Sequence, residues 1–291
     1  MLGILPIILI AAALAAGTYL GYIKTRRAPV IEGPALVIEF LDAELGCAVV
    51  VRTPEGKTLV VDPGPPETVG ALTQYLRDRG VEQVGVMISN PSDVRAGALE
   101  SLLDDLTVTR VWRGEIEGRS RAWKRAMENV RGQAIPEKVV SGGVRLRLSK
   151  SVLLETLSPP PGLLNDANRE NNSLVVRISY GSVRFLLLAD SGTRAEGYLI
   201  SSGADLSSDV LVVGRHGRAG GTSLELLRFV RPQVIVVGAG TGEYVPSSAV
   251  LARIDPRHTG AELYRTDRDG VVTLATDGES IVARTEGAED E

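Results

Sequence analysis

The chain contains the stretches SLVVRISY at 173–180 and VRFLLLA at 183–189, which together decide its fold class. Both are apolar runs rich in branched side chains, as is typical of buried strands. Gly181 and Ser182 lie between them and are turn-forming residues, so the pair predicts a β-hairpin. A predicted helix at 194–202 and a further apolar strand at 210–213 follow this hairpin directly.

The same alternation of hairpins and helices continues in both directions. Upstream we expect strands at 35–41, 47–53, 58–62 and 83–89 and helices at 68–79 and 96–106. Downstream we expect helices at 223–230 and 247–255 and strands at 234–238, 262–265, 271–276 and 280–284. Two similar halves of this kind predict an α/β fold with two sheets packed together and helices outside.

Six stretches are similar to a known family. They are FLD at 40–42, TPEGK at 53–57 with VDPG at 61–64, NNSLVVR at 171–177, FLLLAD at 185–190, DVLVVGRHG at 209–217, and YRTD at 264–267 with Gly270. In their order and spacing they resemble the metallo-β-lactamase superfamily, specifically the hydrolase domain of ComEC-type DNA-uptake proteins. The resemblance implies a metallo-β-lactamase-like αββα sandwich over 35–285, with the active site at one edge between the two sheets.

Enzymes of that family hold two metal ions with a His-x-His-x-Asp-His loop, a bridging aspartate and a late histidine. The chain departs from this pattern at Asn90, Ser92, Val94, Arg95 and Arg215, which occupy ligand positions. Asp190 matches the bridging aspartate, and His216 belongs to the late element. The resemblance therefore implies a degenerate metal site.

The departures argue against metal chemistry on physical grounds. The chain has only two histidines, and asparagine and serine oxygens are poor zinc ligands. A unit charge about 4 Å from another contributes about 4 kcal/mol at an effective dielectric near 20, so Arg95 and Arg215 would oppose a dication strongly. Without a metal there is no water activated near neutral pH. We therefore expect no cofactor.

The candidate vestigial pocket consists of Asp62, Asn90, Ser92, Asp93, Arg95, Asp190, Arg215 and His216. Three interpretations remain open. In the first, the two arginines pair with the carboxylates, above all with Asp190, and fill the old pocket. In the second, they bind an anion such as a phosphate group. In the third, Asp62, Asp93, Asp190 and His216 hold a single hard divalent metal such as magnesium or manganese.

The segment 110–150 is basic, with 11 lysines and arginines against 4 glutamates, and it contains both tryptophans. A helix predicted at 119–133 would place Trp123, Met127 and Val130 on one face. A basic amphipathic helix suits an anionic lipid surface or a nucleic-acid backbone. The alternative is that the tryptophan face packs into the core and the basic face is merely solvated.

The N-terminal region predicts a membrane anchor. Residues 2–23 carry no charge and are long enough to cross a hydrocarbon core of about 30 Å as a helix. Lys24, Arg26 and Arg27 follow, which places the domain on the cytoplasmic side of the cell membrane. A cleavable signal peptide and a secreted domain are the alternative. Gly17 and Gly21 have the spacing of a helix dimer contact, which suggests a homodimer.

Residues 24–34 are expected to form a linker, and 286–291 an acidic tail. Taken together, these features predict a single-pass membrane protein whose metallo-β-lactamase-like domain is a non-catalytic binding or scaffolding module. The rival interpretation is a divergent metal-dependent hydrolase or nuclease of the ComEC type.

Overall fold

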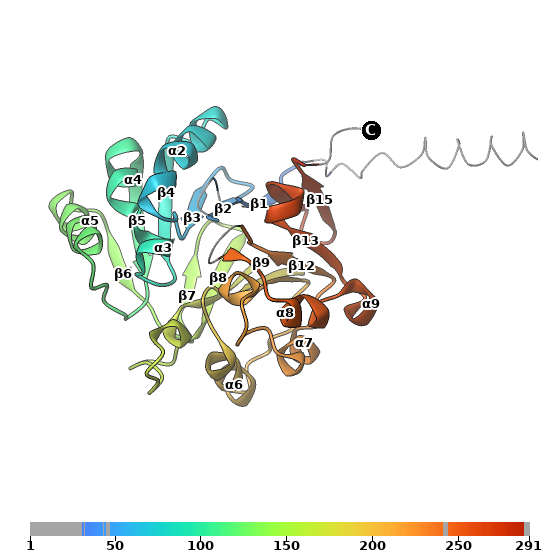
Figure 1. Ribbon diagram of the computed structural model, residues 1–291. Coiled ribbons are helices and arrows are strands. Elements are labelled where there is room, and N and C mark those ends of the chain that lie inside the picture. Colours follow the sequence, from blue (N-terminus) through green and yellow to red (C-terminus); the bar gives the residue numbers. More distant parts are fainter. Residues whose placement is uncertain (1–30, 32, 43, 45–46, 241–243, 288–291) are drawn as a thin grey trace, which may run out of the picture.

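The computed structural model describes residues 31, 33–42, 44, 47–240 and 244–287. These residues form two β-sheets with helices on their outer sides (Figure 1). The predicted membrane helix at 2–23, with Gly17 and Gly21, lies outside the described residues. Among the helices that are described, none has the length and apolar character needed to cross a membrane.

The first sheet is built mainly from the N-terminal half of the chain. Its strands are, in order, β15 (Ile281–Thr285), β14 (Val272–Thr276), β1 (Leu36–Phe40), β2 (Val49–Arg52), β3 (Thr58–Val61), β4 (Gln83–Ile88), β5 (Thr107–Arg113) and β6 (Glu137–Val139). Neighbouring strands are antiparallel from β15 to β3 and parallel from β3 to β6.

The second sheet repeats this mixed pattern. Its strands are, in order, β13 (Glu262–Arg265), β12 (Val234–Val237), β11 (Val210–Val212), β10 (Val183–Leu187), β9 (Val175–Tyr180), β8 (Val152–Ser158) and β7 (Arg145–Arg147). Strands β10 to β13 are parallel, whereas β7 to β10 are antiparallel. The hairpin predicted over residues 173–189 is β9–β10, paired from Val183 against Tyr180 to Leu187 against Val176.

Three apolar layers hold the elements together. The central layer lies between the sheets and includes Phe40, Trp112 and Phe185. A second layer packs the first sheet against α2 (Val69–Asp78), α4 (Leu99–Asp105) and α5 (Arg121–Gly132). A third packs the second sheet against α6 (Thr193–Ser201), α7 (Leu224–Val230) and α8 (Ser248–Arg253). This layering confirms the predicted mixed α/β sandwich.

Short helices connect the main elements. They are η1 (Pro66–Thr68), α3 (Asp93–Ala96), η2 (Arg169–Asn172), η3 (Gly214–Gly217), α9 (Pro256–Thr259) and α10 (Thr266–Asp269). The helix expected at 96–106 begins only at Leu99, because α3 ends at Ala96 in a separate turn. The sequence analysis assigned no strands between 107 and 158, where β5 to β8 lie, because charged residues interrupt the apolar pattern of that segment.

The packing of helix α5 shows where its tryptophan-containing face lies. Trp123, Met127 and Val130 are each at most 3% exposed and belong to the layer between α5 and the first sheet. The Ser120 hydroxyl caps the helix by accepting from the Trp123 backbone N–H at 3.0 Å. The apolar face of α5 is therefore core, and only its basic face is available to solvent.

Candidate functional site

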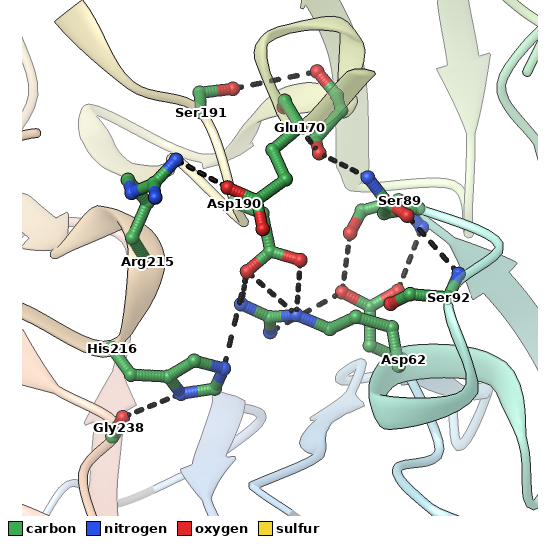
Figure 2. A network of polar contacts seen from close by, with 12 residues as sticks. Asp62, Ser89, Ser92, Glu170, Asp190, Ser191, Arg215, His216 and Gly238 are labelled. Carbon is green, nitrogen blue, oxygen red and sulfur yellow. Dashed lines mark hydrogen bonds and ion pairs between the residues drawn. The ribbon is translucent and has the colours of Figure 1, made fainter. Parts of the chain in front are cut away.

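The site lies at one edge of the sandwich, where parallel strands of both sheets end. Asp62 follows β3, and the loop after β4 leads through α3 to Arg95. Asp190 follows β10, and η3 with Arg215 and His216 follows β11. The carboxyl ends of adjacent parallel strands meet at one sheet edge, so these loops converge. Figure 2 shows Asp190 between Asp62 on one side and the Arg215–His216 segment on the other.

Arg95 joins the two sheets at this edge. Its Nε lies 3.1 Å from both carboxylate oxygens of Asp190, and its Nη2 lies 2.5 Å from Oδ1 of the same residue. Its Nη1 is 3.5 Å from Oδ2 of Asp62. Arg95 is only 9% exposed, and Asp62 and Asp190 are 3% and 5% exposed. One guanidinium therefore lies between two buried carboxylates.

The two carboxylates respond differently to this shared partner. Burial raises the pKa of Asp62 to about 6, although Arg95 and the hydrogen bonds from Ser89 oppose the shift. The Ser89 backbone N–H and hydroxyl donate to Asp62 at 2.7 and 2.5 Å. Burial would also raise the pKa of Asp190, but its short contacts with Arg95 outweigh burial and lower that pKa below the usual range. Asp190 is thus the firmly ionised member of the pair.

His216 has one nitrogen without a partner. Its Nδ1 is 2.8 Å from the Gly238 carbonyl oxygen, so Nδ1 carries the proton and donates. Its Nε2 lies 4.0 Å from Asp190 Oδ1 and has no hydrogen-bond partner among the described residues. Burial, with Arg95 second, lowers the pKa of His216 to about 3. At neutral pH the ring is therefore neutral, with a buried acceptor at Nε2.

Arg215 does not pair with Asp190, and that expectation was wrong. Its Nη1 donates to Oε2 of Glu170 in η2, and Arg218 Nη2 approaches Oε1 of the same carboxylate at 3.6 Å. Arg215 and His216 adopt left-handed backbone conformations, with φ of 56° and 55°. Non-glycine residues adopt this conformation only at a conformational cost. Because of this turn, the neighbouring side chains of Arg215 and His216 meet different partners, Glu170 and the Gly238 carbonyl oxygen.

The remaining predicted residues line the loop after β4. Asn90 is buried, donates from Nδ2 to the Ser173 hydroxyl at 2.9 Å, and accepts from the Ser92 backbone N–H at 3.1 Å. The Ser92 hydroxyl is buried and has no partner in the described part of the chain. Asp93 is exposed in the first turn of α3 and is not part of the ion-pair cluster.

Two small cavities meet at His216. The inner one, of about 40 Å³, has mainly apolar walls, with Asp62, Arg95 and His216 among its lining residues. The outer one, of about 90 Å³, is lined by Ser92, Val94, Glu170, Asp190, His216, Arg218 and Tyr244. Both are smaller than the ~150 Å³ apolar cavity that accepts benzene in an engineered protein. The site therefore takes a ligand of a few atoms.

These residues do not fit a metal pair. Arg95 lies between the two carboxylates that would have to share the cations, and its fixed charge opposes a dication there. Across the described ranges, no group of three or more histidine, cysteine, aspartate or glutamate residues is arranged to hold a metal ion. No catalytic step through a metal follows from this donor set.

Four residues of the site were not predicted from the sequence: Ser89, Glu170, Arg218 and Tyr244. Ser89 directly precedes the segment that contains Asn90, Ser92 and Arg95, and Tyr244 lies in the loop that follows the parallel strand β12. Position alone could have brought both under consideration. Glu170 is 45 residues from Arg215, and no pattern in the sequence connects the two.

Comparison with known proteins finds relatives that are similar to part of the chain in sequence. The chain is 25% identical over 204 residues to ComE operon protein 3 of Bacillus subtilis, covering 69% of this chain and 26% of the relative. It is 31% identical over 115 residues to competence protein ComA of Neisseria gonorrhoeae, covering 38% of this chain and 16% of the relative. The chain thus matches only a minor part of each relative. No protein-family model matches it.

Solved structures share the fold at low identity. CmlA, a diiron β-hydroxylase from Streptomyces venezuelae, superposes with a TM-score of 0.56 at 14% identity, over 85% of this chain and 55% of that one. Zn²⁺-bound PqqB from Methylobacterium extorquens gives 0.50 at 11% identity, over 79% and 87%. These structural likenesses show a metallo-β-lactamase-like fold. In sequence the chain resembles part of two competence proteins, as expected of a ComEC-type domain.

Proposed function

We propose that this chain is a membrane-anchored, non-catalytic binding module of the ComEC type, in which the Arg95 guanidinium replaces the metal pair. The observation that supports the proposal is the position of Arg95, bound to Asp190 on one side and 3.5 Å from Asp62 on the other. A buried arginine bound in this way neutralises the carboxylates that a metal would otherwise neutralise.

The electrostatics of the site favour this replacement. Removing a dication from two buried carboxylates would leave both charges uncompensated, at a cost of several kcal/mol each. Arg95 offsets much of that cost with a bidentate contact, which is stronger and more directional than a single hydrogen bond. The domain can therefore fold without metal, and it lacks an activated water for hydrolysis.

The biological setting is also part of the proposal. The two relatives are named as a ComE operon protein and a competence protein. We place this chain in a competence-related process at the cell membrane, with its domain on the cytoplasmic side of the helix predicted at 2–23. That placement depends on the charges of Lys24, Arg26 and Arg27.

One observation favours the rival function, a divergent single-metal hydrolase. His216 presents a free, neutral Nε2 toward Asp190, with its ring oriented by the Gly238 carbonyl. Metal-binding histidines are commonly oriented by such a second hydrogen bond. However, this histidine and one aspartate fall short of the three protein ligands that a catalytic zinc site uses.

Elemental analysis of the purified full-length chain tests the two functions directly. We expect zinc and manganese well below one equivalent per chain, no rise in melting temperature when either is added, and no phosphodiesterase activity. A matched variant restores the family motif by Asn90→His, Ser92→His, Val94→Asp and Arg95→His, and it should acquire metal. Stoichiometric metal in the unmodified chain, lost on Asp190→Ala or His216→Ala, would refute the proposal and support the hydrolase.

A further inference from the structure

Glu170 pairs with two arginines, and the three side chains differ in how much of each is exposed to solvent. Its carboxylate binds Arg215 and approaches Arg218, and both arginines belong to the segment around η3. The side chain of Arg215 is only 16% exposed, whereas that of Glu170 is 36% exposed. Arg215 is thus held within the protein, whereas the side chains of Arg218 and Glu170 are exposed to a similar extent, at 34% and 36%.

Glu170 leaves two buried polar atoms of the same outer cavity unsatisfied. His216 and Ser92 line this cavity together with Glu170, and neither His216 Nε2 nor the Ser92 hydroxyl has a hydrogen-bond partner among the described residues. His216 is 5% exposed, so water reaches its nitrogen poorly from the bulk. An ionised carboxylate only accepts hydrogen bonds, so Glu170 cannot donate to the neutral Nε2. A buried acceptor left in this way is energetically costly.

These features define which ligand would satisfy the polar groups of the outer cavity better than the Glu170 carboxylate does. It must carry negative charge and accept from the guanidinium groups of Arg215 and Arg218. It must also keep one proton to donate to His216 Nε2, and it must be small enough for a cavity of about 90 Å³. Inorganic phosphate meets all of these conditions at neutral pH, because it retains at least one O–H there. Sulfate has nearly the same shape but no proton.

We propose that Glu170 occupies an anion site between Arg215 and Arg218, and that a protonated phosphate group binds there when Glu170 moves away. This inference rests on the proposed non-catalytic function and adds a ligand class to it. Arginine is well suited to the role because its planar donors match phosphate oxygens. Asp190 also lines the cavity, and its ion pair with Arg95 reduces its repulsion of the anion.

Calorimetric titration of the full-length chain, treated with a chelator and held at pH 7 and constant ionic strength, tests the site. The probes are inorganic phosphate and sulfate. We expect phosphate to bind at least tenfold more tightly than sulfate. A site built to pair with a ligand hydrogen rejects an analogue that lacks it. Glu170→Gln should tighten phosphate binding at least tenfold, because it removes the competing charge. Arg218→Gln should weaken binding at least tenfold.

His216→Phe is the sharpest variant, because it keeps an aromatic ring but removes the acceptor. It should abolish the preference for phosphate over sulfate. Arg257→Gln, which removes an exposed arginine paired with Asp255, should change neither affinity. Equal binding of both anions by the unmodified chain, or no binding by either it or Glu170→Gln, would overturn the inference. Phosphate binding present only before chelation would indicate a metal and refute the proposed function as well. Stoichiometric metal with phosphate binding that survives chelation would refute the proposed function alone.

Discussion

At the scale of single residues, the site is governed by which charges Arg95 compensates. Its guanidinium contacts Asp190 from two nitrogens and Asp62 from a third, and all three side chains are almost completely buried. A buried ion pair contributes little net stability compared with an apolar replacement, but removing one partner alone is strongly destabilising. Arg95 is therefore needed mainly because its two partners cannot remain buried and unpaired.

Arg95→Met tests this dependence. It keeps a long side chain but removes the charge, so the free energy of unfolding at pH 7 should fall by about 3–5 kcal/mol. The loss should be smaller at pH 5, because the raised pKa of Asp62, about 6, allows that carboxyl to be protonated there. Urea unfolding at both pH values measures the effect. Arg257→Met, at an exposed pair, is the control and should change little. A loss below about 1 kcal/mol at pH 7 would contradict the assigned role.

His216 makes stability depend on pH in a defined direction. Its pKa is about 3 in the folded protein, against 6.5 for an ordinary histidine. Below pH 6.5 the unfolded chain takes up a proton that the folded chain refuses, so this residue lowers stability as the pH falls toward 3.

His216→Phe removes that effect and leaves the titration of Asp62 in both proteins. Between pH 7 and pH 5 the unmodified chain should lose about 2 kcal/mol relative to the variant, at about 1.4 kcal/mol per pH unit below 6.5. Urea unfolding curves of the two proteins at each pH give the difference. A difference that does not change with pH would show that His216 is not held neutral.

At the scale of elements, the two faces of α5 have different surroundings, because one packs into the core and the other is exposed. Trp123, Met127 and Val130 pack against the first sheet, while Arg121 and Lys124 are exposed. Arg125 is also on the outer face, but it donates to both carboxylate oxygens of Glu100 at 2.9 Å and helps join α5 to α4. The part of the face free to meet an anionic partner is therefore narrower than the sequence suggested.

The double variant Arg121→Glu with Lys124→Glu tests whether this face binds nucleic acid. If it does, the full-length chain should bind duplex DNA with an affinity that falls steeply between 50 and 200 mM salt. The variant should lose that binding, while its free energy of unfolding stays within about 0.5 kcal/mol, as for other surface changes. Fluorescence anisotropy with labelled DNA makes the measurement. Binding that is insensitive to salt, or equal in the variant, would assign the face to solvent.

At the scale of the whole molecule, the two halves are joined both through the core and at the site. The central apolar layer takes side chains from both sheets, and Arg95–Asp190 and Asn90–Ser173 link their loops. Contacts of this kind should make the two sheets unfold as one unit.

The position of the tryptophans makes that expectation measurable. The chain has two, Trp112 in β5 and Trp123 in α5, and both belong to the first sheet and its helices. Tryptophan fluorescence therefore reports on the first sheet and its helices through Trp123 and on the layer between the sheets through Trp112, whereas far-ultraviolet circular dichroism reports on both halves. The two probes should give the same urea midpoint. A circular dichroism transition that continues after fluorescence is lost would show that the second half unfolds separately.

The sequence by itself determined most of the fold and the central charged residues of the site. Apolar strands and turn residues predicted β1 to β4 and β9 to β15 to within about two residues, because side-chain alternation and burial are recorded locally in the chain. The strands β5 to β8 were missed because charge dominates their segment. The residues at family ligand positions also came from sequence, since each stands at a fixed place after a strand.

Only the tertiary structure decided which of these residues meet. It assigned Arg95 to Asp190 and Asp62, and it assigned Arg215 to Glu170, not to Asp190 as expected. Long-range pairing depends on the direction in which a loop leaves its strand. At Arg215 and His216 that direction is set by two left-handed backbone conformations, which residue types alone did not reveal. The different partners of Arg215 and His216 therefore follow from a backbone turn that only the folded chain shows.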